Sequence, residues 1–179
     1  AEQNPAKYIN SPESPLFSKS QSLYALDVAK DHRTPTGETR SMIVMEGYTD
    51  CLAAHEHGFT NCVACLGTAL TEQHVQLLSR YADRVILVLD GDAAGLAAAD
   101  RALNLFLSGG LELRILSLPE GLDPCDYLQD SGREAFAELL RSAPDALEHK
   151  INVTNRGKNP EIGTHQAATA LEDILATMA

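Results

Sequence analysis

Short apolar runs alternate with helix-forming stretches along the middle of the chain. The runs occupy residues 42–46, 61–66, 84–89 and 111–118. Unbroken apolar runs of this length are typical of strands that are buried on both faces of a sheet. The stretches between them that favour helix lie at residues 51–55, 71–81 and 93–106. This alternation predicts an α/β fold in which helices flank a parallel sheet.

Individual residues mark where the first helices begin and end. Thr49 or Asp50 is placed to cap the helix after the first strand, and Gly58 is placed to end it. Thr71 is expected to start the next helix and Tyr81 to close it.

The two ends of the chain lack this alternation. Residues 1–22 are rich in Asn, Ser, Pro and Lys and predict an extended N-terminal segment, followed by a short helix at 23–30 and a polar turn at 31–40. After the last strand we expect an acidic loop at 121–126 and a small C-terminal helical subdomain. Its helices are predicted at 133–140, 144–151 and 160–178, with a polar linker at 152–159. The predicted divisions are 1–39, 40–122 for the sheet domain, and 123–179 for the acidic loop and helices.

Composition places the chain among globular proteins. Of its 179 residues, 44% are hydrophobic and 22% are charged. No apolar run approaches the roughly 20 residues of a membrane helix, and the first residues lack the apolar core of a signal peptide. We therefore expect a cytoplasmic chain with no membrane association, in which the four cysteines stay reduced. The start without Met predicts that it is a piece of a longer protein.

The formal charge of −11 argues against a stand-alone nucleic-acid binder, because such domains are usually basic. It is consistent with a catalytic fragment whose carboxylates hold metal and whose basic partner segment is missing. Aromatic residues make up only 5% and Trp is absent, so base stacking can contribute little.

Acidic residues follow the predicted strands at the points where these strands end. Glu46 follows the first strand, Asp90 and Asp92 follow the third, and Asp123 and Asp126 lie in the loop after the fourth. The carboxyl ends of parallel strands meet at one edge of a sheet, where such folds place their ligands. Carboxylate oxygens suit Mg²⁺ or Mn²⁺, and sites with two such ions suit phosphoryl transfer. The alternative is that each acid only caps a helix.

A second, weaker signal lies between the second strand and its helix. Gly67 and Thr68 precede the helix that begins near Thr71, and free backbone N–H groups at such a position can bind phosphate. An ordinary tight turn is the alternative explanation.

The cysteines have the spacing of metal ligands without the expected geometry. Cys62 and Cys65 are three residues apart on a strand, so their side chains point to opposite faces, and no second pair exists. Cys51 and His55 are four residues apart on a helix. We predict that Cys62 and Cys65 are small buried core residues and that Cys51 and His55 have packing or surface roles.

The acidic motifs resemble those of the Toprim domain. Toprim proteins share a Glu-Gly motif after the first strand and a D-x-D-x-x-G motif after the third. In this chain the first motif is Glu46-Gly47, and the second is Asp90-Gly-Asp92-Ala-Ala-Gly95. Topoisomerases, recombination mediators and some nucleases carry the same pair, so it indicates the superfamily.

Further motifs resemble the bacterial DNA primases of the DnaG type. KYINSPES at residues 7–14 is similar to the primase KYLNSPET, and EGYTD at 46–50 is similar to EGYMD. LGTALT at 66–71 matches the primase motif letter for letter. The resemblance covers at least residues 5–140. Residues 1–39 would then be the end of the N-terminal primase subdomain and a linker.

The resemblance implies synthesis of short RNA primers on single-stranded DNA by metal-dependent nucleotidyl transfer. Glu46, Asp90 and Asp92 would be catalytic and, with Asp123 and Asp126, would bind Mg²⁺, for which Mn²⁺ would substitute. The residues implied on the nucleotide or template side are Lys7, Tyr8, Asn10 and Lys19, and we add Gly67 and Thr68 to them as the phosphate-binding candidates. The alternative for Tyr8 and Asn10 is a structural role as the link to the preceding subdomain. The implied partners are template DNA, ribonucleoside triphosphates and the RNA primer.

The sequence lacks several parts of a whole primase. Zinc and the replicative helicase are expected to bind only the missing N-terminal and C-terminal domains, and this fragment alone is expected to prime weakly or not at all. Many primases read D-P-D after the fourth strand, where this chain has Asp123-Pro124-Cys125. DNA cleavage and rejoining, or a non-catalytic scaffold, are the alternative functions of a Toprim domain.

Overall fold

A computed structural model of the chain describes residues 11–90, 93–107, 110–119 and 122–155. The elements run in the order α1 (Leu26–Ala29), β1 (Ser41–Met45), α2 (Tyr48–Glu56), β2 (Cys62–Ala64), α3 (Glu72–Leu78), β3 (Arg84–Leu89), α4 (Ala93–Leu107), β4 (Glu112–Ser117), α5 (Pro124–Ser142) and α6 (Ala146–Asn155). All four predicted strands are present.

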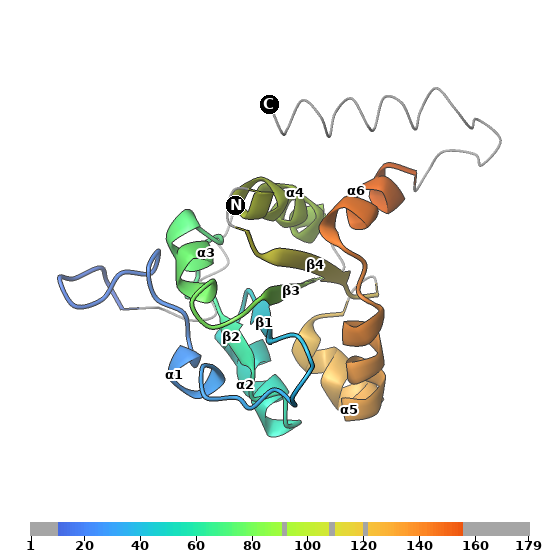
Figure 1. Cartoon of the computed structure of the whole chain (residues 1–179), viewed down its shortest axis with the longest axis horizontal. Coiled ribbons are helices and arrows are strands. Elements are labelled where there is room, and N and C mark those ends of the chain that lie inside the picture. The colour runs from blue at the N-terminus through green and yellow to red at the C-terminus, as the bar shows by residue number, and fades with distance from the viewer. Residues whose placement is uncertain (1–10, 91–92, 108–109, 120–121, 156–179) are drawn as a thin grey trace, which may run out of the picture.

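The four strands form one parallel sheet in the order β2-β1-β3-β4 (Figure 1). Ile43 of β1 lies opposite Ile86 of β3, and Leu89 of β3 lies opposite Ser117 of β4. Helices cover both faces, with α3 and α4 on one and α2 and α5 on the other (Figure 1). The predicted α/β class with a flanked parallel sheet is therefore confirmed.

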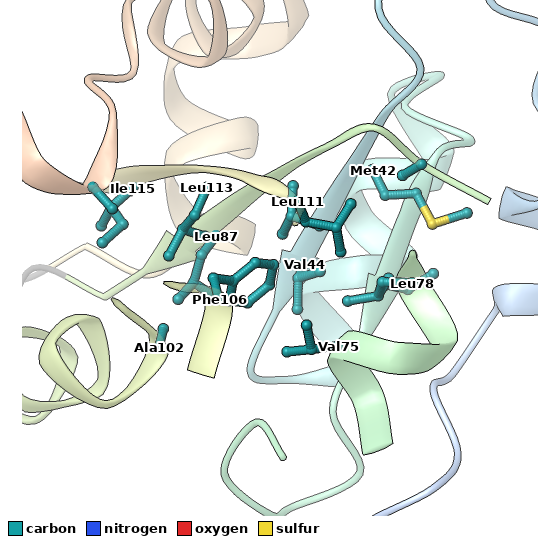
Figure 2. Packing of buried hydrophobic residues seen from close by; sticks show 14 of the residues in the cluster. Met42, Val44, Val75, Leu78, Leu87, Ala102, Phe106, Leu111, Leu113 and Ile115 are labelled. Carbon is teal, nitrogen blue, oxygen red and sulfur yellow. The ribbon is translucent and has the colours of Figure 1, made fainter. Parts of the chain in front are cut away.

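Successive strand residues pack into two different cores. Val44 and Leu87 point to the side of α3 and α4, where they meet Phe106 (Figure 2). Their neighbours Ile43 and Ile86 point to the side of α2 and α5. Because both faces are buried, each strand needs apolar residues at consecutive positions, which explains the unbroken runs in the sequence.

The segment before β1 is attached to the β2 side of the sheet. Tyr24 makes an antiparallel bridge with Ala64, with N···O distances of 2.9 and 3.3 Å, and so covers part of the outer edge of β2. The side chains of the buried residues Leu23 and Ala29 join the core on the α3 and α4 side. The segment around Leu23–Ala29 is thus packed against the sheet.

Several predicted boundaries are wrong. Gly47, rather than Thr49 or Asp50, is the N-cap of α2, because the chain turns into the helix immediately after Glu46. Helix α3 ends at Leu78, before Tyr81. Thr71, in contrast, is the N-cap of α3 as predicted.

The largest departure lies after β4. Residues 124–126, predicted as part of an acidic loop, form the first turn of α5, with Asp123 as N-cap and Pro124 at its first position. Gly132, with φ of 77°, interrupts this helix. Helix α6 extends to Asn155, into the predicted polar linker, and the predicted helix at 160–178 lies outside the described residues.

The cysteines have the packing roles that their spacing predicted. Cys62 and Cys65 are buried in opposite cores. Cys51 is also buried, and the His55 ring donates a hydrogen bond of 2.8 Å from Nε2 to the Cys62 carbonyl oxygen. In the described part of the chain, no helix combines the length and apolarity needed to cross a membrane.

Candidate active site at the carboxyl edge of the sheet

Three of the predicted acids stand at the carboxyl edge of the sheet. Glu46 directly follows β1 and is exposed, and Asp90 directly follows β3 and is half-buried. Asp123 lies at the start of α5, where its Oδ1 accepts a hydrogen bond of 2.7 Å from the backbone N–H of Asp126. Asp92 lies outside the described residues.

Asp50 joins this group from the first turn of α2, and sequence reasoning had considered it only as a helix cap. Burial raises the pKa of the Asp50 carboxyl to about 6, and the charges of Asp123 and Asp90 contribute to that rise. The backbone N–H of Cys125 donates a hydrogen bond to the carboxylate, which opposes this rise in pKa. Asp50 therefore links the first turn of α2 to the start of α5. The motif resemblance at 46–50 was the signal that could have identified it.

Asp90 and Asp123 lie close enough to Asp50 for their negative charges to raise its pKa. Above about pH 6 Asp50 carries its charge at a cost in stability, which a cation would relieve. The donors are all oxygens, the chemistry that Mg²⁺ and Mn²⁺ prefer. Among the described residues, no three His, Cys, Asp or Glu side chains are grouped tightly enough to hold one ion.

The two motif glycines leave room for these acids. A Cβ atom on Gly47 would overlap the Asp50 carboxylate, although the backbone of Gly47 suits any residue. A Cβ atom on Gly95 would overlap the backbone carbonyl oxygen of Asp90. Glycine is therefore required at Gly95, where the close approach is to backbone, whereas a Cβ atom at Gly47 would displace only the end of the Asp50 side chain.

A cleft of about 260 Å³ opens beside Glu46, on the α3 and α4 side of the edge. Gly67 and Thr68, from the loop after β2, line the cleft together with Glu46. Arg101 of α4 lines the same cleft and is the one cationic side chain among its described lining residues. It makes no ion pair or hydrogen bond within the described part of the chain. Sequence reasoning missed Arg101, because a single Arg on a helix carries no motif.

Cys65 also lines this cleft but is a poor nucleophile. Burial raises the pKa of its thiol to about 12, and the nearby Glu46 carboxylate adds to the rise. The thiol stays protonated at neutral pH, so covalent catalysis by Cys65 is disfavoured.

His74 brings part of the N-terminal segment to this end of the molecule. Its Nε2–H donates a hydrogen bond of 2.9 Å to the Lys19 carbonyl oxygen, and its Nδ1 accepts one of 3.3 Å from the backbone N–H of Thr71. The Thr71 hydroxyl also donates to the Ser20 carbonyl oxygen at 2.7 Å. Lys19 thus lies next to the start of α3, which follows the Gly67 loop. Sequence reasoning did not identify His74.

Other predicted residues are less closely associated with the edge. Asp126 is exposed in the first turn of α5. Cys125, where related motifs carry Asp, accepts a hydrogen bond of 3.2 Å at Sγ from Gln129, and burial raises the pKa of its thiol. Lys7, Tyr8 and Asn10 lie outside the described residues.

Comparison with known families identifies the class to which this fold and edge belong. The profile of the Toprim-like family matches residues 43–128, from β1 into α5. The sheet with its acidic carboxyl edge is therefore a Toprim domain. A second profile, the N-terminal domain of the DNA primase catalytic core, matches residues 1–30.

Proteins with similar sequences assign the chain to a family within the Toprim class. The DNA primase of Campylobacter jejuni is 45% identical over 168 residues, which cover 94% of this chain and 26% of the relative. That of Clostridium acetobutylicum is 40% identical over 146 residues, covering 82% of this chain and 24% of the relative. The chain thus spans about a quarter of the length of these relatives.

Solved structures give the same assignment. The zinc-binding and RNA polymerase domains of the Aquifex aeolicus primase match with a TM-score of 0.80 and 34% identity, covering 100% of this chain and 42% of that one. A DnaG primase catalytic domain bound to single-stranded DNA matches with a TM-score of 0.79 and 32% identity. The match covers 98% of this chain and 56% of that one. The chain belongs to the bacterial DnaG-type DNA primases and corresponds to part of their catalytic core.

Proposed function

We propose that this chain is the catalytic core segment of a primase that synthesises short RNA primers on single-stranded DNA by metal-dependent nucleotidyl transfer. The observation that carries the proposal is the placement of Glu46, Asp90 and Asp123 at the carboxyl edge of one parallel sheet, after β1, after β3 and at the start of α5. Family membership supports the same reaction, and the solved relative bound to single-stranded DNA supports such a template.

Glu46, Asp90 and Asp92 are the proposed catalytic ligands of Mg²⁺, with Asp123 and Asp126 as further ligands. When bound, the metal would neutralise triphosphate charge and lower the pKa of the attacking 3′-hydroxyl. Within the chain, Gly95 allows the backbone carbonyl of Asp90 to pass close to the start of α4. The Asp50 carboxylate accepts a hydrogen bond from the backbone N–H of Cys125, which connects the start of α2 to the start of α5. Mn²⁺ would substitute because it accepts the same oxygen donors.

The remaining predicted residues are proposed to contact nucleotide or template. Gly67 and Thr68 line the cleft beside Glu46, which supports a role in holding phosphate. Lys19 lies next to the start of α3, which supports its assignment to the same side. Lys7, Tyr8 and Asn10 belong to the same N-terminal motif and are proposed to act with it.

We also propose the domain divisions at 1–39, 40–122 and 123–179, with zinc bound outside these residues. The last division falls at the N-cap of α5. A helicase partner would bind outside this chain. We expect the isolated fragment to prime weakly or not at all.

Arg101→Ala is expected to weaken nucleotide use, because the guanidinium is the one cation on the described wall of the cleft. In the complete primase polypeptide that contains this chain, we expect the KM for ribonucleoside triphosphates to rise about tenfold, the effect of one lost charge-assisted contact. Arg101→Lys should recover part of the loss. The measurement is incorporation of labelled ribonucleotides on a single-stranded DNA template.

Arg141→Ala is the matched control, since Arg141 is exposed on α5 and pairs with Glu138. It should leave KM unchanged. A wild-type polypeptide that makes no template-dependent RNA would refute the proposed function. An unchanged KM in Arg101→Ala, with synthesis intact, would refute only the role of Arg101.

A further inference from the structure

A small cavity at the opposite, amino edge of the sheet has the chemistry of an anion site. The cavity measures about 110 Å³ and lies where α1 and α3 end and β1 begins. Three permanently cationic side chains line it, those of Lys30, Arg40 and Arg80. The described residues that line it include no acid, in a chain of formal charge −11.

Two of these cations have no acidic partner among the described residues. Neither Lys30 nor Arg80 takes part in an ion pair within that part of the chain. Arg40 is different, because its Nε and Nη2 donate hydrogen bonds of 2.9 and 2.7 Å to the Asp83 carboxylate. That pairing fixes the orientation of Arg40, and the Asp83 carboxylate offsets its charge, so Arg40 adds little net charge to the cavity. The uncompensated charge at the cavity therefore comes from Lys30 and Arg80.

Hydroxyl groups complete the lining. Thr34, Ser41 and Tyr81 carry one each, of which the Ser41 hydroxyl donates a hydrogen bond of 3.2 Å to the Thr39 carbonyl oxygen, and His32 adds an imidazole. The His32 Nδ1 lies 2.8 Å from the Thr60 hydroxyl oxygen, which holds the ring in place. Cations together with hydroxyl donors are the groups that bind phosphate oxygens in proteins.

Helix ends alone do not account for this arrangement. The negative ends of α1 and α3 favour one nearby cation each, which would explain Lys30 and Arg80 as separate surface residues. It would not explain why both line one cavity together with Arg40 and three hydroxyl-bearing side chains. The cavity is also well below the roughly 300 Å³ at which pockets for drug-sized ligands begin, so it suits a single group.

We propose that this cavity binds a phosphate group, at a site separate from the polymerase site. Strand β1 separates the two sites by its five residues, about 16 Å at the usual rise per residue. The bound phosphate is either a free ion or part of the backbone of a nucleic acid that lies across the amino edge. The proposal does not depend on the polymerase activity, since none of its residues belongs to the carboxyl edge.

The test is a titration of the whole chain with inorganic phosphate at constant ionic strength, followed by the amide NMR signals of Thr34, Ser41 and Tyr81. We expect saturable shifts at these three amides. Lys30→Gln and Arg80→Gln, which keep their aliphatic stems, should each weaken binding about tenfold because each removes one charge-assisted contact. Their Tm values should stay close to that of the wild type.

Arg33→Gln is the matched control, since it removes the same charge from the same surface but does not line the cavity. It should change the phosphate affinity by less than about twofold, as expected for a screened surface charge. Shifts that do not saturate, or an Arg33→Gln effect equal to that of Arg80→Gln, would overturn the proposal.

A second titration identifies the source of the phosphate and keeps the same readout. A short single-stranded DNA that competes with inorganic phosphate at these amides assigns the cavity to a nucleic-acid backbone. Saturable phosphate binding that the DNA does not affect assigns it to a free ion.

Discussion

Asp90→Asn is expected to lower template-directed primer synthesis by about two to three orders of magnitude in the complete primase polypeptide. The substitution removes a proposed metal ligand and with it the stabilisation of charge on the reacting phosphate. The fold should remain intact, because the Asp90 charge contributes to the raised pKa of the Asp50 carboxyl. Without that charge, the Asp50 pKa should fall toward its usual value. The measurements are primer yield with time and the Tm of the same preparation.

Asp27→Asn is the control for this experiment, since Asp27 is an exposed acid on α1, away from the carboxyl edge. It should leave primer yield unchanged. A fully active Asp90→Asn enzyme would contradict the assignment of Asp90 to the reaction. A variant that is inactive and also strongly destabilised would contradict our view that the Asp90 charge is unfavourable to the fold.

His74→Ala is expected to lower the free energy of unfolding by about 2–4 kcal/mol, through a buried cavity and two lost hydrogen bonds. The loss should also loosen the segment around Lys19 from α3. The measurements are chemical denaturation and amide exchange of Thr71. Gln73→Ala, at the exposed neighbouring position, is the control and should change stability by less than about 0.5 kcal/mol.

His74 also makes the stability of the fold depend on pH, with lower stability at acidic pH. Burial lowers the pKa of the His74 imidazole, because the folded protein favours the neutral ring. Below the unfolded pKa near 6.5, the unfolded chain therefore binds more protons than the folded one, and stability falls as pH decreases toward the folded pKa. His74→Ala should flatten this part of the stability profile. An equal pH slope in wild type and variant would contradict the assignment of the slope to His74.

The sheet could be predicted from the sequence because its strands are buried on both faces. Each strand is a local run of apolar residues, and the acids at its carboxyl end follow directly in the chain, as with Glu46 and Asp90. The opposed directions of Cys62 and Cys65 follow from the period of a strand in the same way. These features depend on neighbouring residues only.

The features that were missed depend on contacts between distant segments. Asp50 joins the acidic group only because α5 begins at Pro124 and directs the Cys125 N–H toward it. His74 has its role because Lys19, far back in the chain, packs against the start of α3. Arg101 lines the cleft through the docking of α4 on the sheet. No local pattern in the sequence records these contacts.

The proposed function requires that the acids at the carboxyl edge form one divalent-cation site. Titration of the whole chain with Mn²⁺, followed by electron paramagnetic resonance of the free ion, tests it directly, with Glu46→Gln and Asp90→Asn measured alongside and Asp27→Asn as control. We predict saturable binding that is lost in both edge variants and retained in the control. Binding that neither edge substitution changes would contradict the claim and favour a Toprim domain acting as a scaffold.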